Sequence, residues 1–471
     1  MRSNPICRRE FLCGLGALAA APARAAHRKP NFIVLFADDL GYGDLGCYGS
    51  QTIRTPNLDR MAGQGVRFTN FYAGAPFCSP SRASMLTGRY PVRAGVPNVL
   101  FPTEKTGLPP EEMTFAELLK PQGYRTGCVG KWHLGNEPIF RAHRQGFDFF
   151  YGLPYANDCR KQLPGEPFRP VLAPDELPLM ENDKVIEAPV DQHTLTERYT
   201  QRALRFIRES RDNPFVLYLA YTAPHTPIYA ATEREGKSPA GLYADTVEEV
   251  DASAGRVLDT LRELKLDRDT LVLFTSDNGP RRSGKDPREG GGSTAGLRGV
   301  KGLTWEGGMR VPGIFWWPGQ SKPGGERSDP ASVLDVFPTM AKLAGAQLPR
   351  DRVIDGASLD GVLTGTAPLK DRLFCYYFGA QLQAVRLGRW KLILKIDAYP
   401  PKPPSIWYKD EKIFRAHYRL MPQPQLFDLV ADPDEKTDVA ASHPDIVKDL
   451  AQRAQSFDAA MQRDKRPQLY L

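Results

Sequence analysis

Four short apolar runs, each followed at once by charged or polar residues, constrain the fold of this chain more than any other feature. The runs and the residues that follow them are 31–37 before Asp38 and Asp39, 126–130 before Lys131 and His133, 215–221 before His225, and 270–276 before Asp277 and Asn278. Such uniformly apolar runs are typical of strands buried on both faces of a sheet. Segments with helical periodicity, such as 114–120 and 243–264, lie between them, so strands alternate with helices.

This alternation predicts an α/β domain, in which helices cover both faces of a large, mostly parallel or mixed sheet. Ligands of open parallel sheets bind beyond the carboxyl ends of the strands, so we expect the four polar clusters to meet in one crevice. Past residue 364 the runs 373–378 and 384–395, with a turn at Gly388, indicate antiparallel strands, and 445–461 indicates a helix. The length of 471 residues accommodates this smaller α+β domain, which we place at 365–471.

The N-terminus has the pattern of an export signal. Arg8 and Arg9 precede an apolar run that ends at Ala21, and the small residues at 23–25 suit cleavage. The segment 1–26 resembles a twin-arginine signal, whereas the alternative of a membrane anchor would need about 20 apolar residues. We therefore expect a periplasmic or extracellular protein with no stable membrane insertion, whose larger domain spans 27–364.

The charge of the mature chain does not favour nucleic acid as a partner. Removing four arginines and one glutamate with residues 1–26 lowers the formal charge from +7 to +4. A nucleic-acid-binding protein usually carries a stronger basic balance.

Cys78 has no other cysteine near it in the sequence. Its nearest neighbours are Cys47 and Cys128, which excludes a short disulfide or a zinc knuckle. Either a buried, inert thiol or a reactive position remains. Loss of the signal would leave an odd number of cysteines, Cys47, Cys78, Cys128, Cys159 and Cys375, which marks one of them as special and leaves the pairing of the others open.

The sequence around this cysteine is Cys-Ser-Pro-Ser-Arg at 78–82, followed by Leu-Thr-Gly-Arg at 86–89. It resembles the signature of the sulfatase family, within the alkaline phosphatase-like superfamily, and is most similar to arylsulfatase A and N-acetylgalactosamine-6-sulfatase. The similarity extends to the motifs at 37–46, 130–135, 276–279, 299–308 and 426–435. The resemblance implies that a formylglycine-generating enzyme oxidises Cys78 to formylglycine.

The two motifs with paired polar residues, Asp38-Asp39 and Asp277-Asn278, predict a metal site. They offer only oxygen ligands, which suit a hard cation and favour calcium over zinc. The family resemblance implies the same ion, Ca²⁺, held by these four residues and by the modified Cys78.

The resemblance also assigns catalytic roles. Arg82, Lys131 and Lys301 would hold the modified residue and the sulfate oxygens. His225, together with Lys301, would protonate the leaving alcohol, and His133 would accept a proton as sulfate departs. Cys78 is expected to begin a helix, where the helix dipole favours an anion.

Together these features predict an exported, calcium-dependent sulfatase that hydrolyses sulfate monoesters, of carbohydrates or of aryl alcohols. One alternative is a phosphomonoesterase or phosphodiesterase of the same superfamily, and another is a sulfated-glycan binding protein without catalysis. We expect the loops at 97–107, 158–189, 281–296 and 399–420 to set specificity. The natural substrate and the oligomeric state are left open.

Overall fold

The computed structural model describes residues 29–161, 171–172, 176–282, 288, 290–402, 409 and 411–471. The predicted export signal, 1–26, lies outside these residues. Within them, no helix is both long and apolar enough to cross a membrane.

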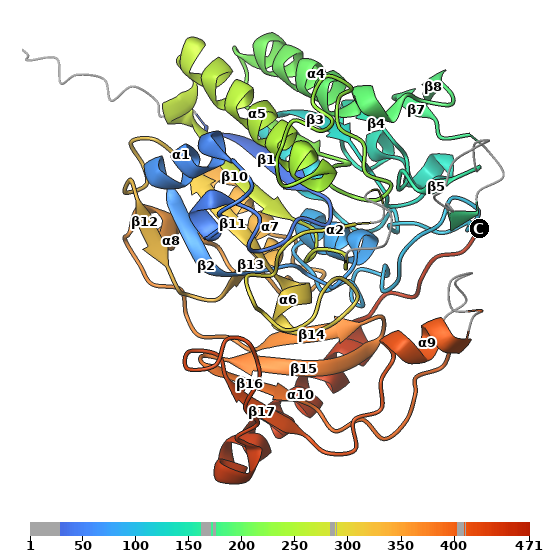
Figure 1. The fold of residues 1–471 in the computed structure, drawn as a ribbon, viewed down its shortest axis with the longest axis vertical. Coiled ribbons are helices and arrows are strands. Elements are labelled where there is room, and N and C mark those ends of the chain that lie inside the picture. Colours follow the sequence, from blue (N-terminus) through green and yellow to red (C-terminus); the bar gives the residue numbers. More distant parts are fainter. Residues whose placement is uncertain are drawn as a thin grey trace, which may run out of the picture.

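A mixed sheet of 11 strands forms the centre of the described structure (Figure 1). Its order is β12-β2-β11-β10-β1-β9-β3-β4-β7-β8, with β13 paired to β2. The strands are β1 (Asn31–Ala37), β2 (Val66–Tyr72), β3 (Arg125–Gly130), β4 (Phe149–Gly152), β7 (Leu179–Glu181), β8 (Lys184–Glu187), β9 (Phe215–Ala220), β10 (Thr270–Ser276), β11 (Arg310–Trp316), β12 (Gly325–Arg327) and β13 (Ala331–Ser332). The central strands β10, β1, β9, β3 and β4 are parallel, which confirms the predicted α/β fold.

Helices cover both faces of this sheet, as the apolar strands require. In β1, Phe32, Val34 and Phe36 pack into one core layer, while Ile33 and Leu35 pack into the other, because successive side chains of a strand point to opposite faces. The first layer includes residues of α2 (Cys78–Thr87), α3 (Phe115–Leu119) and α7 (Val336–Ala344). The second includes residues of α1 (Pro56–Gln64), α4 (Leu195–Ser210) and α5 (Leu242–Glu263).

The C-terminal part contains a separate antiparallel sheet, as predicted (Figure 1). Its strands are β14 (Phe374–Phe378), β15 (Gln381–Leu387), β16 (Trp390–Ile393) and β17 (Gln425–Asp428). The turn between β15 and β16 contains Gly388 at a φ of 57°, a conformation that favours glycine. Helix α10 (Pro444–Asp464) packs on this sheet. The division at residues 364 and 365 itself stays a prediction.

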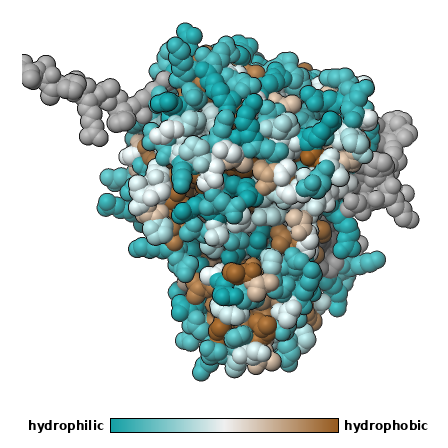
Figure 2. Space-filling model, turned by 60° about the vertical axis from the view of Figure 1, so that its left-hand side comes forward, coloured by the Kyte–Doolittle hydropathy of each residue, from teal (hydrophilic) through white to brown (hydrophobic). Residues whose placement is uncertain are grey.

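The remaining elements are short. They are α6 (Glu306–Met309), α8 (Asp360–Thr364), α9 (Glu411–His417), and the paired strands β5 (Cys159–Arg160) and β6 (Val171–Leu172). Figure 2 shows a mostly hydrophilic surface on which hydrophobic residues gather in small groups, several of them over the lower, C-terminal part.

A buried ionic network joins the two sheets. Lys391 on β16 lies 3.0 Å from Glu306 Oε1 and 2.8 Å from Glu435 Oε1, and all three side chains are fully buried. Burial opposes ionisation of Glu306, but Lys391 and Arg310 outweigh it and hold the pKa of Glu306 well below its usual range. The motif around Glu435, which lacks the glycine and the distant glutamate of an EF-hand loop, therefore has a structural role.

Candidate active site

The predicted metal ligands of two separate motifs lie side by side because the strands that precede them are neighbours. Strands β1 and β10 pair in parallel and in register up to their last residues, so Asp38 and Asp39 emerge next to Asp277 and Asn278. Asn278 Nδ2 donates to Asp39 Oδ1 at 2.7 Å, and the backbone N–H of Asp39 donates to Asp277 Oδ1 at 3.1 Å. All four residues are at most 1% exposed. The predicted convergence of these clusters is confirmed.

Cys78 is the first residue of α2, as the sequence predicted. It is 3% exposed, and burial raises the pKa of its thiol, although Lys131 and Lys301 act in the opposite direction. A thiol with a raised pKa carries little thiolate and is a weak nucleophile. The encoded side chain is therefore poorly suited to act as a nucleophile itself.

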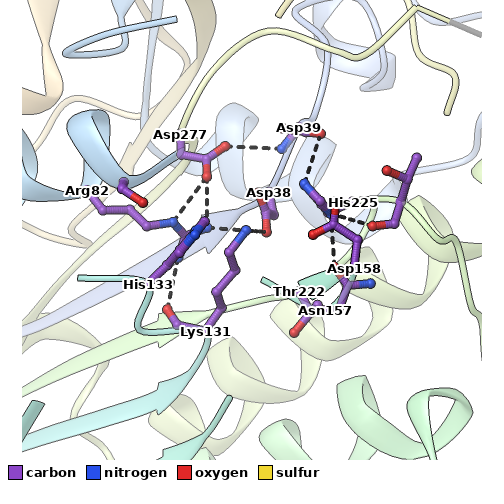
Figure 3. Close-up of polar contacts among 12 residues, drawn as sticks. Asp38, Asp39, Arg82, Lys131, His133, Asn157, Asp158, Thr222, His225 and Asp277 are labelled. Atoms are coloured by element: carbon purple, nitrogen blue, oxygen red, sulfur yellow. Dashed lines mark hydrogen bonds and ion pairs between the residues drawn. The ribbon is translucent and has the colours of Figure 1, made fainter. Parts of the chain in front are cut away.

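Arg82 lies one helical turn after Cys78, so both side chains share a face of α2. Its Nη2 and Nε donate to Asp277 Oδ2 at 2.8 and 3.1 Å, and its Nη1 donates to the carbonyl of Lys131 at 2.9 Å. The guanidinium is fully buried. These bonds fix the guanidinium of Arg82 between Asp277, a predicted metal ligand, and the 131–133 motif (Figure 3).

Two lysines pair with the carboxylates that follow β1. Lys131 Nζ lies 2.6 Å from Asp38 Oδ2, and Lys301 Nζ lies 2.6 Å from Asp39 Oδ1. Burial alone would lower the pKa of each ammonium group, but the paired carboxylates more than offset this and raise both pKa values. Both side chains therefore remain protonated cations at neutral pH.

His133 has one ring nitrogen engaged and one without a partner. Its Nε2 lies 2.9 Å from the carbonyl oxygen of Leu100, which can only accept, so Nε2 carries the hydrogen. Nδ1 is buried and makes no hydrogen bond to any of the described residues. Burial, and then the charges of Lys131 and Arg82, lower the pKa of His133 well below its usual value. Neutral His133 thus presents an unprotonated nitrogen at Nδ1.

His225 is oriented by a residue that the sequence analysis missed. Its Nδ1 lies 2.6 Å from the carbonyl of Thr226, which assigns the hydrogen to Nδ1, and 2.9 Å from Asn157 Oδ1. Its Nε2 lies 3.7 Å from Asp39 Oδ2. Burial, and then Lys301 and Lys131, lower the pKa of His225 well below its usual value. Asn157 follows β4 just as the other clusters follow their strands, and that pattern is the signal that could have found it.

The donor atoms of this cluster fit a divalent cation. Asp38 Oδ1 and Asn278 Oδ1 are buried acceptor atoms that no donor within the described part of the chain bonds. Burial and the neighbouring Asp277 raise the pKa of Asp38, so a cation there would stabilise its ionised form. Ligand atoms of Asp38, Asp39 and His225 also lie within 4.8 Å of one another. The mainly oxygen donor set matches the preference of calcium.

Every predicted site residue thus lies at the carboxyl ends of the central strands or on the helix and loops beside them. The carboxylates are contacted directly by Arg82, Lys131, Lys301 and His225. Cys78 and His133 make no such contact, but the charge of Lys131 lowers the pKa of both side chains. The three carboxylates face three permanent cations. This arrangement can hold a metal ion and an anion together.

Comparison with known proteins assigns the family. The sulfatase family model matches residues 30–346, and the model for the C-terminal region of aryl-sulfatase matches 369–469. Steryl-sulfatase of Mus musculus is 40% identical over 88% of this chain and 79% of its own length. Arylsulfatase A of Homo sapiens is 38% identical over 92% and 89%, and N-acetylgalactosamine-6-sulfatase of Canis lupus familiaris is 42% identical over 80% and 73%.

Solved structures of sulfatases share the whole fold. The PsFucS1 sulfatase from Pseudoalteromonas sp. superposes with a TM-score of 0.82 at 28% identity, over 94% of this chain and 92% of that one. Ps i-CgsB in complex with k-i-k-neocarrahexaose superposes with a TM-score of 0.75 at 31% identity, over 92% and 93%. With both family models matched and relatives this similar along most of its length, the chain belongs to the sulfatase family and is a sulfuric ester hydrolase.

Proposed function

We propose that this protein is an exported, calcium-dependent sulfatase that uses formylglycine at position 78 to hydrolyse sulfate monoesters of carbohydrates. The observation that carries the proposal is the position of Cys78. It begins α2 one turn before Arg82, and the charges of Lys131, Lys301, Asp38 and Asp277 all act on its side chain. A hard cation and a sulfate group can both be accommodated there.

Asp38, Asp39, Asp277 and Asn278 would hold the calcium ion, with residue 78 completing the set. The two orphaned oxygens, on Asp38 and Asn278, support this assignment because buried acceptors normally have a partner. When bound, calcium lowers the cost of ionising a nearby hydroxyl and neutralises developing charge.

A formylglycine at position 78 supplies, as its hydrate, two hydroxyl groups on one carbon, of which one can attack sulfur and the other can later release sulfate. The chain positions this residue where it is needed. The N-terminus of α2 favours negative charge at that point, and Lys131 and Lys301 add two fixed cations. The raised pKa of the encoded thiol supports the need for the modification.

The cations and histidines divide the remaining tasks. Arg82 fixes the position of Asp277, and Lys131 and Lys301 bind sulfate oxygens. His133 accepts a proton at Nδ1, the buried nitrogen that no hydrogen bond occupies. Lys301 holds a proton for the leaving alcohol. His225 carries its hydrogen on Nδ1, so it shares that transfer only after Nε2, which lies 3.7 Å from Asp39 Oδ2, has taken up a proton.

A sulfated carbohydrate is the substrate class that the structural relatives favour. The Ps i-CgsB structure contains k-i-k-neocarrahexaose. A Bacteroides thetaiotaomicron protein, solved in work on the metabolism of multiple glycosaminoglycans, superposes with a TM-score of 0.78 at 29% identity, over 92% of this chain and 100% of that one. Export through a twin-arginine signal and maturation by a formylglycine-generating enzyme complete the proposal.

The proposal is tested on purified protein by mass spectrometry of the tryptic fragment 68–82, together with assays on 4-nitrophenyl sulfate and 4-nitrophenyl phosphate. We expect an aldehyde at position 78 and a strong preference for the sulfate ester. An unmodified thiol in fully active protein would refute the proposed nucleophile. A preference for phosphate would favour the phosphoesterase alternative, and an absence of hydrolysis with retained glycan binding would favour the binding protein.

A further inference from the structure

Asp158 lies at the active site, yet no step above uses it. The segment 153–158 that carries it is held on both sides of the site. The carbonyls of Leu153 and Pro154 accept from the backbone N–H groups of the 131–133 motif, at 2.9 and 3.1 Å. Asn157, the preceding residue, bonds His225 at 2.9 Å (Figure 3). Asp158 is therefore fixed in position relative to both proposed proton-transfer residues.

The electrostatic surroundings of Asp158 are those of the sulfate site. Burial raises the pKa of Asp158, while Lys131, Lys301 and Arg281 act in the opposite direction and Asp39 adds to the increase. The two lysines, however, make their close ion pairs with Asp38 and Asp39 instead. Asp158 therefore lies beside the cations as a further carboxylate, not as their main partner.

The carboxylate of Asp158 has acceptor capacity that the protein does not fill. Its Oδ1 receives only the weak donor Cys159 Sγ, at 3.6 Å, and no donor from the described residues bonds Oδ2. The residue is 8% exposed. A carboxylate can accept about four hydrogen bonds, and Oδ2 is not among the fully buried acceptors that lack a partner, so this oxygen is open to donors from a bound molecule.

We infer that Asp158 determines specificity by accepting hydrogen bonds from hydroxyl groups of the alcohol that carries the scissile sulfate. The inference rests on the proposed function and narrows its carbohydrate substrates to those with a free hydroxyl beside the scissile sulfate ester. A neighbouring sulfate group would be repelled, and a hydrocarbon ring would bury the carboxylate without a partner, which costs free energy. A free hydroxyl beside the scissile ester satisfies it.

The test compares Asp158→Asn with the unchanged protein on 4-nitrophenyl sulfate, which has no neighbouring hydroxyl, and on a panel of sulfated monosaccharides. We expect the ratio of kcat/KM for the best sugar to kcat/KM for the aryl sulfate to fall about 10- to 100-fold, as for the loss of a charge-assisted hydrogen bond. The KM for the aryl sulfate should decrease, because a negative charge near the anion has been removed. Asp158→Ala should shift the ratio at least as far.

Asp251→Asn is a matched control, because Asp251 is also buried but bonds only the start of α1, at the backbone N–H of Leu58 and at Asn57. It should lower Tm without changing the ratio. Equal losses on both substrates in Asp158→Asn would overturn the inference, as would an unchanged ratio. Wild-type protein that hydrolyses the aryl sulfate but no sulfated sugar would also overturn it, whereas formylglycine-bearing wild type with no sulfatase activity would refute the proposed function instead.

Discussion

Replacement of Lys301 by alanine tests the electrostatic part of the mechanism most directly. The ammonium group lies 2.6 and 2.8 Å from the two carboxylate oxygens of Asp39, and its side chain is 11% exposed. Burial opposes the charge of this group, but Asp39 outweighs burial and raises its pKa, so it stays charged. The chain thus holds a desolvated cation in place before the substrate arrives.

The magnitude follows from what such a preorganised donor contributes. Removing one donor that stabilises charge in the transition state costs roughly 3–4 kcal/mol of activation free energy. Each 1.36 kcal/mol corresponds to about a tenfold change in rate. We therefore expect turnover of 4-nitrophenyl sulfate by Lys301→Ala to fall about 10²- to 10³-fold at saturating substrate.

The assay must separate lost catalysis from lost folding or lost modification. Rates are therefore expressed per molecule that carries formylglycine, and Tm is measured in parallel. Lys391→Met is the matched control, since Lys391 is also a buried lysine between two carboxylates but lies in the network that joins the sheets. Loss of its charge should destabilise the fold by about 3–5 kcal/mol and leave turnover per folded molecule unchanged.

Turnover by Lys301→Ala within tenfold of the wild-type rate, with full formylglycine content, would refute the reasoning. The same conclusion would follow if Lys391→Met lost as much turnover per folded molecule as Lys301→Ala. In that case general weakening of the structure, and not the position of one cation, would explain the effect.

Two further predictions concern metal and pH. Treatment with a calcium chelator should abolish sulfatase activity and lower Tm, with recovery on added Ca²⁺ but not Mg²⁺, because the oxygen-rich cluster suits the larger ion; undiminished activity after verified removal of the metal would contradict the proposed site. Burial raises the pKa of Glu249 from 4.5 to about 7, so the folded protein binds a proton at this carboxyl group more tightly than the unfolded chain does. The protonated carboxyl group therefore contributes its full stability below about pH 4.5, and this contribution is lost as the pH rises to 7. Glu249→Gln, which keeps an acceptor for the N–H of Ala231, should therefore raise the free energy of unfolding at pH 8 by roughly 3 kcal/mol but not at pH 4.5; equal effects at both pH values, measured by urea unfolding, would contradict this.

The parts of the structure that could be predicted from the sequence are those encoded locally. Strands β1 and β10 match the predicted runs residue for residue, because their uniform apolar character leaves little ambiguity. The start of α2 at Cys78 was likewise predicted. Once the strands were recognised as parallel, the meeting of Asp38 with Asp277 followed from the geometry of the sheet.

What could not be predicted depends on side chains that meet only after folding. Glu435 lies in a polar motif typical of an exposed turn, yet it is buried against Lys391, 44 positions earlier in the numbering. Asn157 bonds His225 across 68 positions. The position of Asn157 after β4 marks it as a candidate site residue, but its partner has no signal in the sequence, and neither does the partner of Glu435. Both pairings are set by how loops fold over the sheet edge.

The ion pairs at the site link metal binding to anion binding. Lys131 and Lys301 neutralise Asp38 and Asp39, the same carboxylates that are proposed to hold a divalent cation. A divalent cation bound to those carboxylates would weaken their ion pairs with the two ammonium groups. The ammonium groups would then be able to bind sulfate oxygens. The charges of Asp38, Asp39 and Asp277 balance those of Lys131, Lys301 and Arg82, and a divalent cation together with a sulfate monoester and one ionised hydroxyl would preserve that balance. Coupling between two binding events is reciprocal. If bound metal increases the affinity for sulfate, bound sulfate must therefore increase the affinity for the metal by the same factor.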